Sequence, residues 1–238
     1  MAAIAAALAL AGGVLQGVTG FGASVVMMLG LPYFFAIPQA AGISTAVCTA
    51  LNALMVWRYR DAVNVKKALM PSVLYLAVST VCINFGSRVD GPLLKKIFGG
   101  FLILLAIYYL FFDRKTGSRK MALPVAALCV VVSGACDGLF GIGGPLMVVY
   151  YMRTIESRRE YLGTISLCFG VNCLYNTVYR LITGVLHAEH LPPIGVGIAA
   201  VIAGVWIAGW IADKLNADLL RKLTYITIGV SGLINLIL

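Results

Sequence analysis

One glycine pattern, present twice in this chain, constrains its fold more than any other feature of the sequence. The two copies share four glycines at identical spacing, Gly13, Gly17, Gly20 and Gly22 in the first and Gly134, Gly138, Gly141 and Gly143 in the second. Both copies lie inside long apolar stretches, so they indicate a duplicated chain that departs from regular helix at matching places. In membrane proteins, broken helices at corresponding positions of two halves point to the binding site.

The apolar stretches themselves predict an all-α integral membrane protein. The chain is 61% hydrophobic and 11% charged, with a mean hydropathy of +0.96, whereas soluble chains are about 45–50% apolar and about 25% charged. Its apolar segments approach or exceed the roughly 17–25 residues that cross a bilayer as helix. They cover residues 2–35, 39–57, 69–86, 92–112, 121–152, 161–186, 191–212 and 219–238.

The duplication extends past the glycines into the helices that follow them. Asn52, in the apolar run after the first glycine copy, is matched 120 residues later by Asn172. No Pro/Ser-rich linker separates the halves. We therefore expect one membrane domain, residues 1–238, made of two repeats, 1–115 and 120–238, each with a glycine-broken element and three transmembrane helices.

The distribution of basic residues predicts the topology. If all eight runs crossed the membrane, the 18 Lys and Arg residues would divide equally between its two sides. If both glycine-broken runs instead turn back, four fall on one side, Arg88, Lys95, Lys96 and Arg180. The other 14 then share the second side: Arg58, Arg60, Lys66, Lys67, Arg114, Lys115, Arg119, Lys120, Arg153, Arg158, Arg159, Lys214, Arg221 and Lys222.

The positive-inside rule favours the second arrangement. Each repeat is then a re-entrant hairpin plus three crossings, an odd number, so the two repeats are inverted in the membrane. The protein is expected to be multi-pass in the inner (cytoplasmic) membrane of the cell, with both termini outside the cytoplasm.

The glycines have two physical interpretations. Glycine reaches positive φ and lets another backbone or a ligand approach closely, and the N-terminus of a helix that restarts after a break binds anions. On this basis, new helices near 23–29 and 145–149 would cradle one anion between them. The candidate substrate-binding residues at the two breaks are Gly20, Gly22, Ser24, Gly141, Gly143 and Gly144. The alternative is tight helix packing, which suits the Gly-x3-Gly pairs at the start of each pattern.

Asp137 is the one acidic residue outside the predicted loops. A carboxylate at the centre of a membrane helix is costly, about 2.5–3.5 kcal/mol on insertion scales. It is therefore our candidate for proton coupling, with hydrogen bonding to exposed backbone as the structural alternative. Its counterpart in the first repeat is Gln16, so a proton-coupling role would belong to one repeat alone.

Polar side chains in the helices after the breaks complete the candidate site. Asn52, Asn172 and Asn176 either support the broken backbone or contact substrate oxygens; Asn172 and Asn176 are four residues apart and share one helix face. Arg60 and Arg180 end equivalent helices. A guanidinium either snorkels to the interface or pairs with an oxyanion through its planar donor fork, and Arg180 favours the second because the apolar run continues past it.

Other kinds of site find little support in the sequence. The six cysteines form no zinc-type spacing, and a metal site at His187, Glu189 and His190 is not expected. No cofactor motif is present, because the glycines lack the strand–turn–helix context of a dinucleotide site. No basic face suggests nucleic acid. An enzyme would need a nucleophile–base pair or a metal cluster, and neither is apparent.

The glycine pattern resembles that of the TauE/SafE family of sulfite and organosulfonate exporters. The resemblance covers essentially the whole chain and is most specific at Gly134–Pro145 with the aligned Gly13–Ser24. The first copy departs from the second in having Ala23 and Ser24 in place of a glycine and a proline. The resemblance implies transport of a small sulfur-containing anion, such as sulfite or sulfoacetate.

Taken with the residues, the resemblance predicts a secondary transporter that exports this anion by alternating access around the paired hairpins, with protons as the expected coupling ion. An anion channel or a carboxylate transporter with the same paired-hairpin site is the alternative, and a purely structural subunit is a third. The expected partners are the anion, protons and the lipid bilayer; a homo-oligomer is compatible with the sequence.

Overall fold

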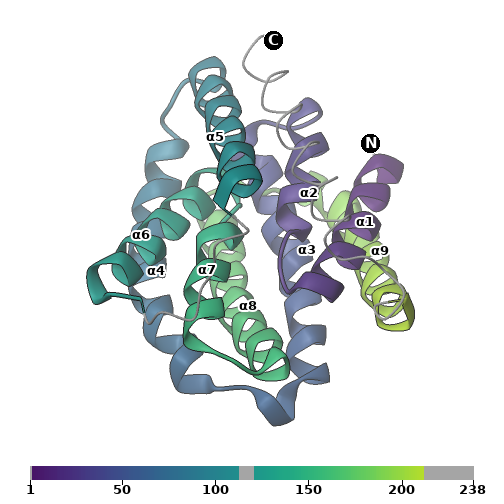
Figure 1. The fold of residues 1–238 in the computed structure, drawn as a ribbon. Helices are drawn as coiled ribbons and strands as arrows, with labels where there is room; N and C mark the ends of the chain where they lie inside the picture. The colour runs from purple at the N-terminus through teal and green to yellow at the C-terminus, as the bar shows by residue number, and fades with distance from the viewer. Residues whose placement is uncertain (1, 113–120, 212–238) are drawn as a thin grey trace.

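The computed structural model describes residues 2–112 and 121–211. Within these residues the chain is helical, with no strand (Figure 1). The apolar run at 219–238 and the charged loop at 113–120 lie outside the described residues. The helices are α1 (Ala2–Thr19), α2 (Ala23–Gly30), α3 (Ile37–Arg58), α4 (Val65–Gly86), α5 (Gly91–Phe112), α6 (Leu123–Phe140), α7 (Gly144–Thr154), α8 (Arg158–Ile182) and α9 (Leu191–Ile211), with short 3-10 turns at Leu31–Tyr33, Arg60–Ala62 and Ala188–His190.

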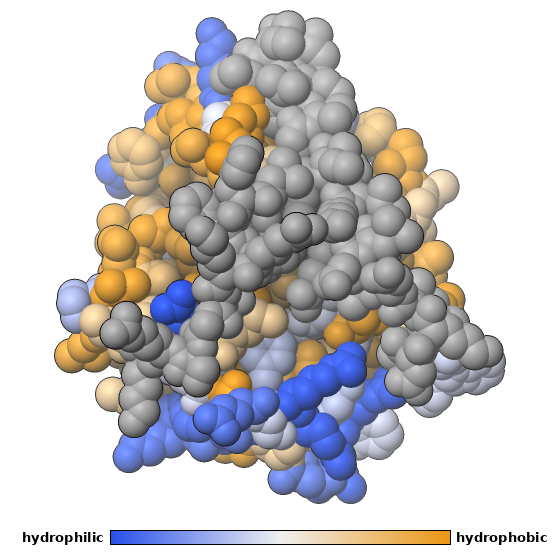
Figure 2. Space-filling view, in the orientation of Figure 1, coloured by the Kyte–Doolittle hydropathy of each residue, from blue (hydrophilic) through white to orange (hydrophobic). Residues whose placement is uncertain are grey.

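Several of these helices suit a membrane. Among the described residues, four segments are long and apolar enough to cross a bilayer: Ile37–Arg58, Val65–Gly86, Leu123–Phe140 and Ala188–Trp210. Figure 2 shows apolar surface on the flanks of the molecule and hydrophilic surface along its lower edge. This pattern is that of a multi-pass membrane protein, because apolar flanks face lipid tails while polar ends face water.

Both glycine patterns interrupt a helix, as predicted. Thr19 ends α1 and Ala23 begins α2, while Phe140 ends α6 and Gly144 begins α7. Three of the intervening glycines have positive φ, 85° at Gly20, 108° at Gly22 and 66° at Gly141. L-residues avoid this region because Cβ crowds the following carbonyl. Glycine is therefore what permits each break.

Gly143, in contrast, has an ordinary φ of −99°. Position 143 requires glycine for lack of space, because a Cβ there would lie 1.7 Å from the Tyr75 hydroxyl oxygen. The fourth glycine therefore has a different role in each copy: Gly22 adopts a positive φ, whereas Gly143 makes room for Tyr75.

The helices on either side of the first break run antiparallel. A Cβ at Gly12 of α1 would touch the backbone of Ala23 at the start of α2, and Gly30 at the end of α2 faces Leu8 near the start of α1. The chain therefore turns back on itself at this break. α6 and α7 likewise pack against each other across the second break.

The first two glycines of each pattern serve close helix packing. Gly13 faces Val201 and Gly204 of α9. Gly17, one turn later, faces Ala208, one turn further along α9. Residue numbers rise together, so α1 and α9 are parallel. The arrangement agrees with the packing interpretation of these Gly-x3-Gly pairs.

The second pattern repeats this arrangement on α4. Gly134 of α6 faces the backbone of Tyr75, and Gly138 faces Ser79 and Cys82. Numbers again rise together, so α6 and α4 are parallel. Figure 1 shows the α4–α6 pair and the α1–α9 pair on opposite flanks of a centre that contains α3 and α8, which pack on each other.

The α4–α6 contact yields a stability prediction. A Cβ at Gly138 would lie 2.5 Å from the Ser79 carbonyl oxygen, which is backbone and cannot move aside. We expect Gly138→Ala to lower the free energy of unfolding by the roughly 1–3 kcal/mol of an overpacked core. Thermal unfolding of purified protein measures this. Gly100→Ala is the control, because a Cβ at Gly100 meets nothing within 4 Å; equal melting temperatures for the two variants would contradict the packing account.

Candidate functional site

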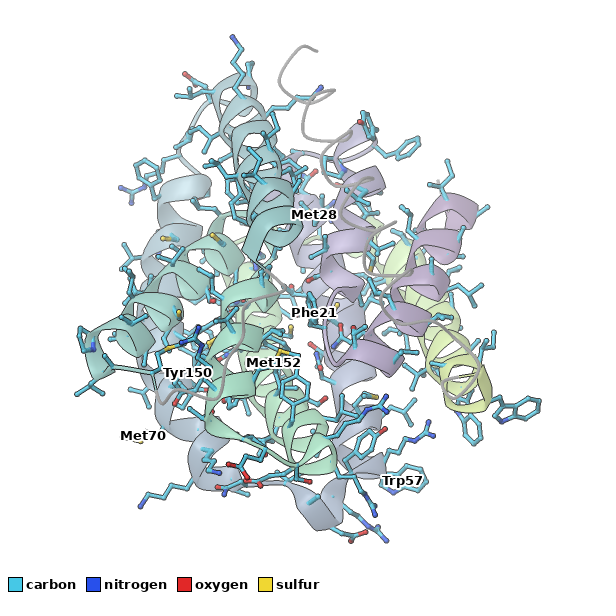
Figure 3. All side chains as sticks on the ribbon, viewed as in Figure 1. Phe21, Met28, Trp57, Met70, Tyr150 and Met152 are labelled. Carbon is cyan, nitrogen blue, oxygen red and sulfur yellow. The ribbon has the colours of Figure 1, made fainter. Side chains whose placement is uncertain are left out.

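The two breaks meet in the interior of the protein. Phe21, from the first break, lies against Gly144 at the start of α7, and Figure 3 shows Phe21 in the centre of the molecule. A small cavity of about 20 Å³ lies between the breaks, roughly room for one water molecule. It is lined by Gln16, Gly22, Ser24, Cys48, Asn52, Tyr75, Asp137, Gly141, Gly143, Gly144, Phe169, Asn172 and Cys173.

Gln16 organises the first break. Its Oε1 accepts a hydrogen bond from the backbone N–H of Ala23 at 3.1 Å, and its Nε2 donates to Oδ1 of Asn52 at 3.0 Å. Asn52 in turn donates from Nδ2 to the Cys48 carbonyl at 2.8 Å. One side chain thus caps the new helix α2 and ties it to α3. Asn52 supports this break through Gln16, while it also lines the cavity.

Asp137 occupies the equivalent place in the second repeat, but it has different partners. The carboxylate accepts a hydrogen bond from Nδ2 of Asn176 and also bonds the side chain of Tyr75. Asn176 accepts from the Ser79 hydroxyl at 3.0 Å. Asp137 is 3% exposed and is the one buried carboxylate among the residues the structure describes. A buried carboxylate that borders a cavity is a group whose charge state affects any ligand beside it.

Arg180 lies in the interior rather than at the interface. Its side chain is 1% exposed, whereas Arg60, its counterpart in the first repeat, is 69% exposed and faces Asp61. Nη2 of Arg180 donates to the carbonyl oxygens of Gly138 at 2.7 Å and Asp137 at 3.3 Å. Arg180 therefore satisfies the last carbonyls of α6, and it does not belong among the loop charges with which the topology was predicted.

Two donor nitrogens of Arg180, Nε and Nη1, are buried and have no hydrogen-bond partner among the described residues. The same holds for Oδ1 of Asn172, whose Nδ2 donates to the Cys168 sulfur at 3.5 Å. Buried polar atoms without partners cost free energy, and of these two residues Asn172 lines the cavity.

The structure brings most of the predicted site residues to the cavity and leaves three outside its lining. Eight of them line it: Gly22, Ser24, Asn52, Asp137, Gly141, Gly143, Gly144 and Asn172. Gly20 instead packs on Tyr161 and Leu162 of α8. Asn176 and Arg180 stand behind the lining, where they hold Asp137 and the end of α6.

Sequence reasoning missed four lining residues, Cys48, Tyr75, Phe169 and Cys173, and it did not assign Gln16 to the site. The sequence could have identified Gln16 as a site residue, since its place in the first glycine pattern corresponds to that of Asp137 in the second. The two cysteines look like ordinary buried apolar residues in the sequence. Tyr75 lies in α4, which carries no glycine pattern and gave no reason to expect contact with the breaks.

His187, Glu189 and His190 cluster at the start of α9, with candidate ligand atoms within 4.8 Å of one another. Nδ1 of His190 accepts a hydrogen bond from the backbone N–H of His187 at 2.9 Å. A neutral imidazole with its Nδ1 lone pair engaged carries its proton on Nε2, so the ring has no lone pair left for a metal. The hydrogen bonds of this cluster instead cap the 3-10 turn at Ala188–His190.

Comparisons with known proteins identify a related family. The profile of the family described as sulfite exporter TauE/SafE matches residues 4–234. A curated relative from Methanocaldococcus jannaschii, named as a probable membrane transporter protein, is 32% identical over 130 residues, covering 49% of this chain and 47% of the relative. The match thus spans about half the length of that relative. No solved structure matches the chain.

The family profile covers nearly the whole chain, including both glycine breaks and the cavity between them. Membership in this family, together with the apolar helices, indicates a membrane protein of the transporter kind. The chain belongs to the sulfite exporter TauE/SafE family.

Proposed function

We propose that this protein is a secondary transporter that exports a small sulfur-containing anion, sulfite or an organosulfonate such as sulfoacetate, across the cytoplasmic membrane. The observation that carries the proposal is the cavity bordered by both helix breaks. In it, the N-terminal ends of α2 and α7 come together with amide side chains from α3 and α8. Helix N-termini favour negative charge, so the cavity suits an oxyanion.

The proposed architecture is a single domain of two inverted repeats with re-entrant hairpins, 1–115 and 120–238. It is supported by helix directions. α4 begins just after the basic segment at 58–62 and runs away from it, while α9 ends beside Arg58, as Gly209 touches that guanidinium. Because α6 is parallel to α4 and α1 is parallel to α9, the two broken elements run in opposite directions.

The ends of the hairpins support the same proposal. α7 returns to the side on which α4 begins, since Nζ of Lys67 donates to the Thr154 carbonyl at 3.5 Å and the Tyr151 hydroxyl donates to the Lys67 carbonyl at 3.0 Å. Gly30, at the end of α2, lies beside Leu8, near the opposite end of the molecule from the first break. Each hairpin would then leave the membrane on the side from which it entered, and both chain termini would be non-cytoplasmic.

Asn172 and Arg180 are the proposed hydrogen-bond donors to a sulfite or sulfonate group. Rotating the Asn172 amide by 180° lets its oxygen accept from the Cys168 thiol and turns its two N–H donors away from that sulfur. Arg180, whose Nε and Nη1 have no hydrogen-bond partner among the described residues, supplies the nearest buried positive charge to Asp137. A guanidinium recognises such oxyanions through its planar fork.

The cavity is too small for the proposed substrate in this conformation. A sulfite ion has four heavy atoms, and about 20 Å³ holds one water-sized molecule. Substrate access therefore requires the two breaks to move apart, toward one side of the membrane or the other. Such motion of one repeat against the other is the alternating-access scheme of inverted-repeat transporters.

Flux into proteoliposomes tests the proposed function. We expect saturable sulfite or sulfoacetate flux with counterflow, in which external substrate accelerates release of labelled internal substrate. A pH gradient is expected to drive it if Asp137 couples protons. Unitary currents without saturation would indicate a channel, and equal transport of acetate would indicate a carboxylate transporter; either result would refute the proposal.

Arg180 provides a sharper test of anion recognition. Removing its guanidinium in Arg180→Gln takes away the buried positive charge near the cavity, and charged hydrogen bonds contribute about 1.5–3 kcal/mol each. We expect at least a tenfold rise in the substrate concentration for half-maximal flux. Arg60→Gln, at the exposed counterpart, is the matched control and should leave it unchanged; equal effects of the two changes would speak against recognition by Arg180.

A further inference from the structure

A second hollow, separate from the cavity, lies in the surface between α3 and α9. It has a volume of about 220 Å³. Leu54, Trp57 and Arg58 form its α3 side, and Trp206, Gly209 and Trp210 form its α9 side. We call it the tryptophan groove. Figure 3 shows Trp57 projecting from the lower edge of the molecule, beyond the central helices.

The tryptophan groove lies at the level where membrane meets water. The candidate membrane spans end at Arg58 in α3 and at Trp210 in α9, and both residues line the groove. Its three tryptophans are 64%, 58% and 83% exposed at Trp57, Trp206 and Trp210. Indole rings favour the headgroup level of a bilayer, where the apolar ring and the polar N–H both find suitable surroundings.

One end of the groove carries a cation without a protein counter-ion. The Arg58 guanidinium rests on the backbone of α9 at Gly209, where a Cβ would lie 2.6 Å from Nη1. Among the described residues, no carboxylate lies within 4 Å of it. The neighbouring Arg60 differs in this respect, because it faces Asp61 at 3.8 Å. The groove thus has apolar aromatic walls and, at its polar end, a positive charge that no carboxylate of the described residues neutralises.

We propose that the tryptophan groove binds an anionic phospholipid, with the phosphate on Arg58 and an acyl chain along Leu54 and Trp206. The occupant must be amphiphilic because the groove is apolar along its walls and cationic at the interface. It must be anionic because the Arg58 guanidinium has no carboxylate partner among the described residues, and basic residues at a membrane surface attract anionic lipids.

Tryptophan fluorescence tests this directly, because the chain has three tryptophans and all three line the groove. Purified protein in phosphatidylcholine nanodiscs is titrated with phosphatidylglycerol whose acyl chains carry bromine, which quenches indole on contact. We expect quenching to saturate at a low phosphatidylglycerol fraction and to weaken at high salt. Arg58→Gln should raise the half-saturating fraction about fivefold, the effect of one basic residue at an anionic surface.

Arg60→Gln is the matched control, since it removes an equal charge two residues away and leaves the groove intact. Melting temperatures of both variants verify that they fold. The proposal is overturned if brominated phosphatidylcholine quenches as well as brominated phosphatidylglycerol, or if both variants shift the titration equally. It is also overturned if quenching follows protein density in the disc rather than lipid charge, which would indicate self-association. None of these readouts depends on transport.

Discussion

Asp137→Asn should abolish the pH dependence of transport while the protein still folds. The amide oxygen of asparagine can accept the hydrogen bond that Nδ2 of Asn176 now donates to the carboxylate, so the packing around position 137 is retained. What is lost is the buried group that can take up and release a proton beside the cavity. We therefore expect sulfite flux to become flat with pH and to lose its response to an imposed pH gradient, with an unchanged melting temperature.

Flux into proteoliposomes at several internal and external pH values measures this. Asp90→Asn is the control, because Asp90 is an exposed carboxylate outside the cavity and its loss should leave the pH profile as it was. If both variants keep the pH dependence of transport, Asp137 has a purely structural role, which is to hold Asn176 and Tyr75.

Gly141→Ala should remove transport and destabilise the protein strongly. Gly141 has φ +66°, and a Cβ there would lie 3.1–3.2 Å from the Cα, Cβ and carbonyl oxygen of Ala41. The left-handed conformation costs an L-residue about 1–2 kcal/mol, and crowding against backbone adds about 1–3 kcal/mol. The change should also displace the second break from α3 and with it the lining of the cavity.

Gly184 offers a close control for this prediction. It has φ +70°, yet a Cβ there would meet nothing within 4 Å. Gly184→Ala should therefore show the conformational cost alone, about 1–2 kcal/mol, and transport substrate normally. Thermal unfolding and flux measured on both variants separate the two contributions. Equal losses in both would mean that the fit of the second break against Ala41 is unimportant.

Local chemistry explains why the helix breaks could be predicted from the sequence. Only glycine adopts positive φ without cost, so closely spaced glycines inside an apolar run indicate where a helix stops. The expected new helices near 23–29 and 145–149 correspond to α2 and α7. The Gly-x3-Gly pairs were predictable for a similar reason, because small residues one turn apart let two helices approach.

The partners of the polar groups were not predictable, because they depend on which helices pack together. Asn172 and Asn176 share one face of α8, as their spacing requires, but Asn172 lines the cavity while Asn176 holds Asp137. The apolar run past Arg180 indicated that it need not snorkel, but its actual partners, the carbonyls of α6, follow only from the contact of α8 with α6. Tyr75 reaches the second break solely because α4 packs on α6.

Ligand-induced stabilisation, with and without a filled cavity, tests the central claim that both breaks together bind one sulfur oxyanion. Gly144 lines the cavity, and a Cβ there would make only ordinary contact with Phe21 at 3.5 Å, so Gly144→Ala should fold and place a methyl group in the binding site. We predict that sulfite or sulfoacetate raises the melting temperature of the unaltered protein. At a ligand concentration of a hundred times Kd, binding should add about 2.7 kcal/mol to the free energy of unfolding. Acetate should leave the melting temperature unchanged, and the Gly144→Ala variant should not be stabilised by either sulfur oxyanion. Stabilisation that is equal in Gly144→Ala, or absent for every sulfur oxyanion, would contradict it.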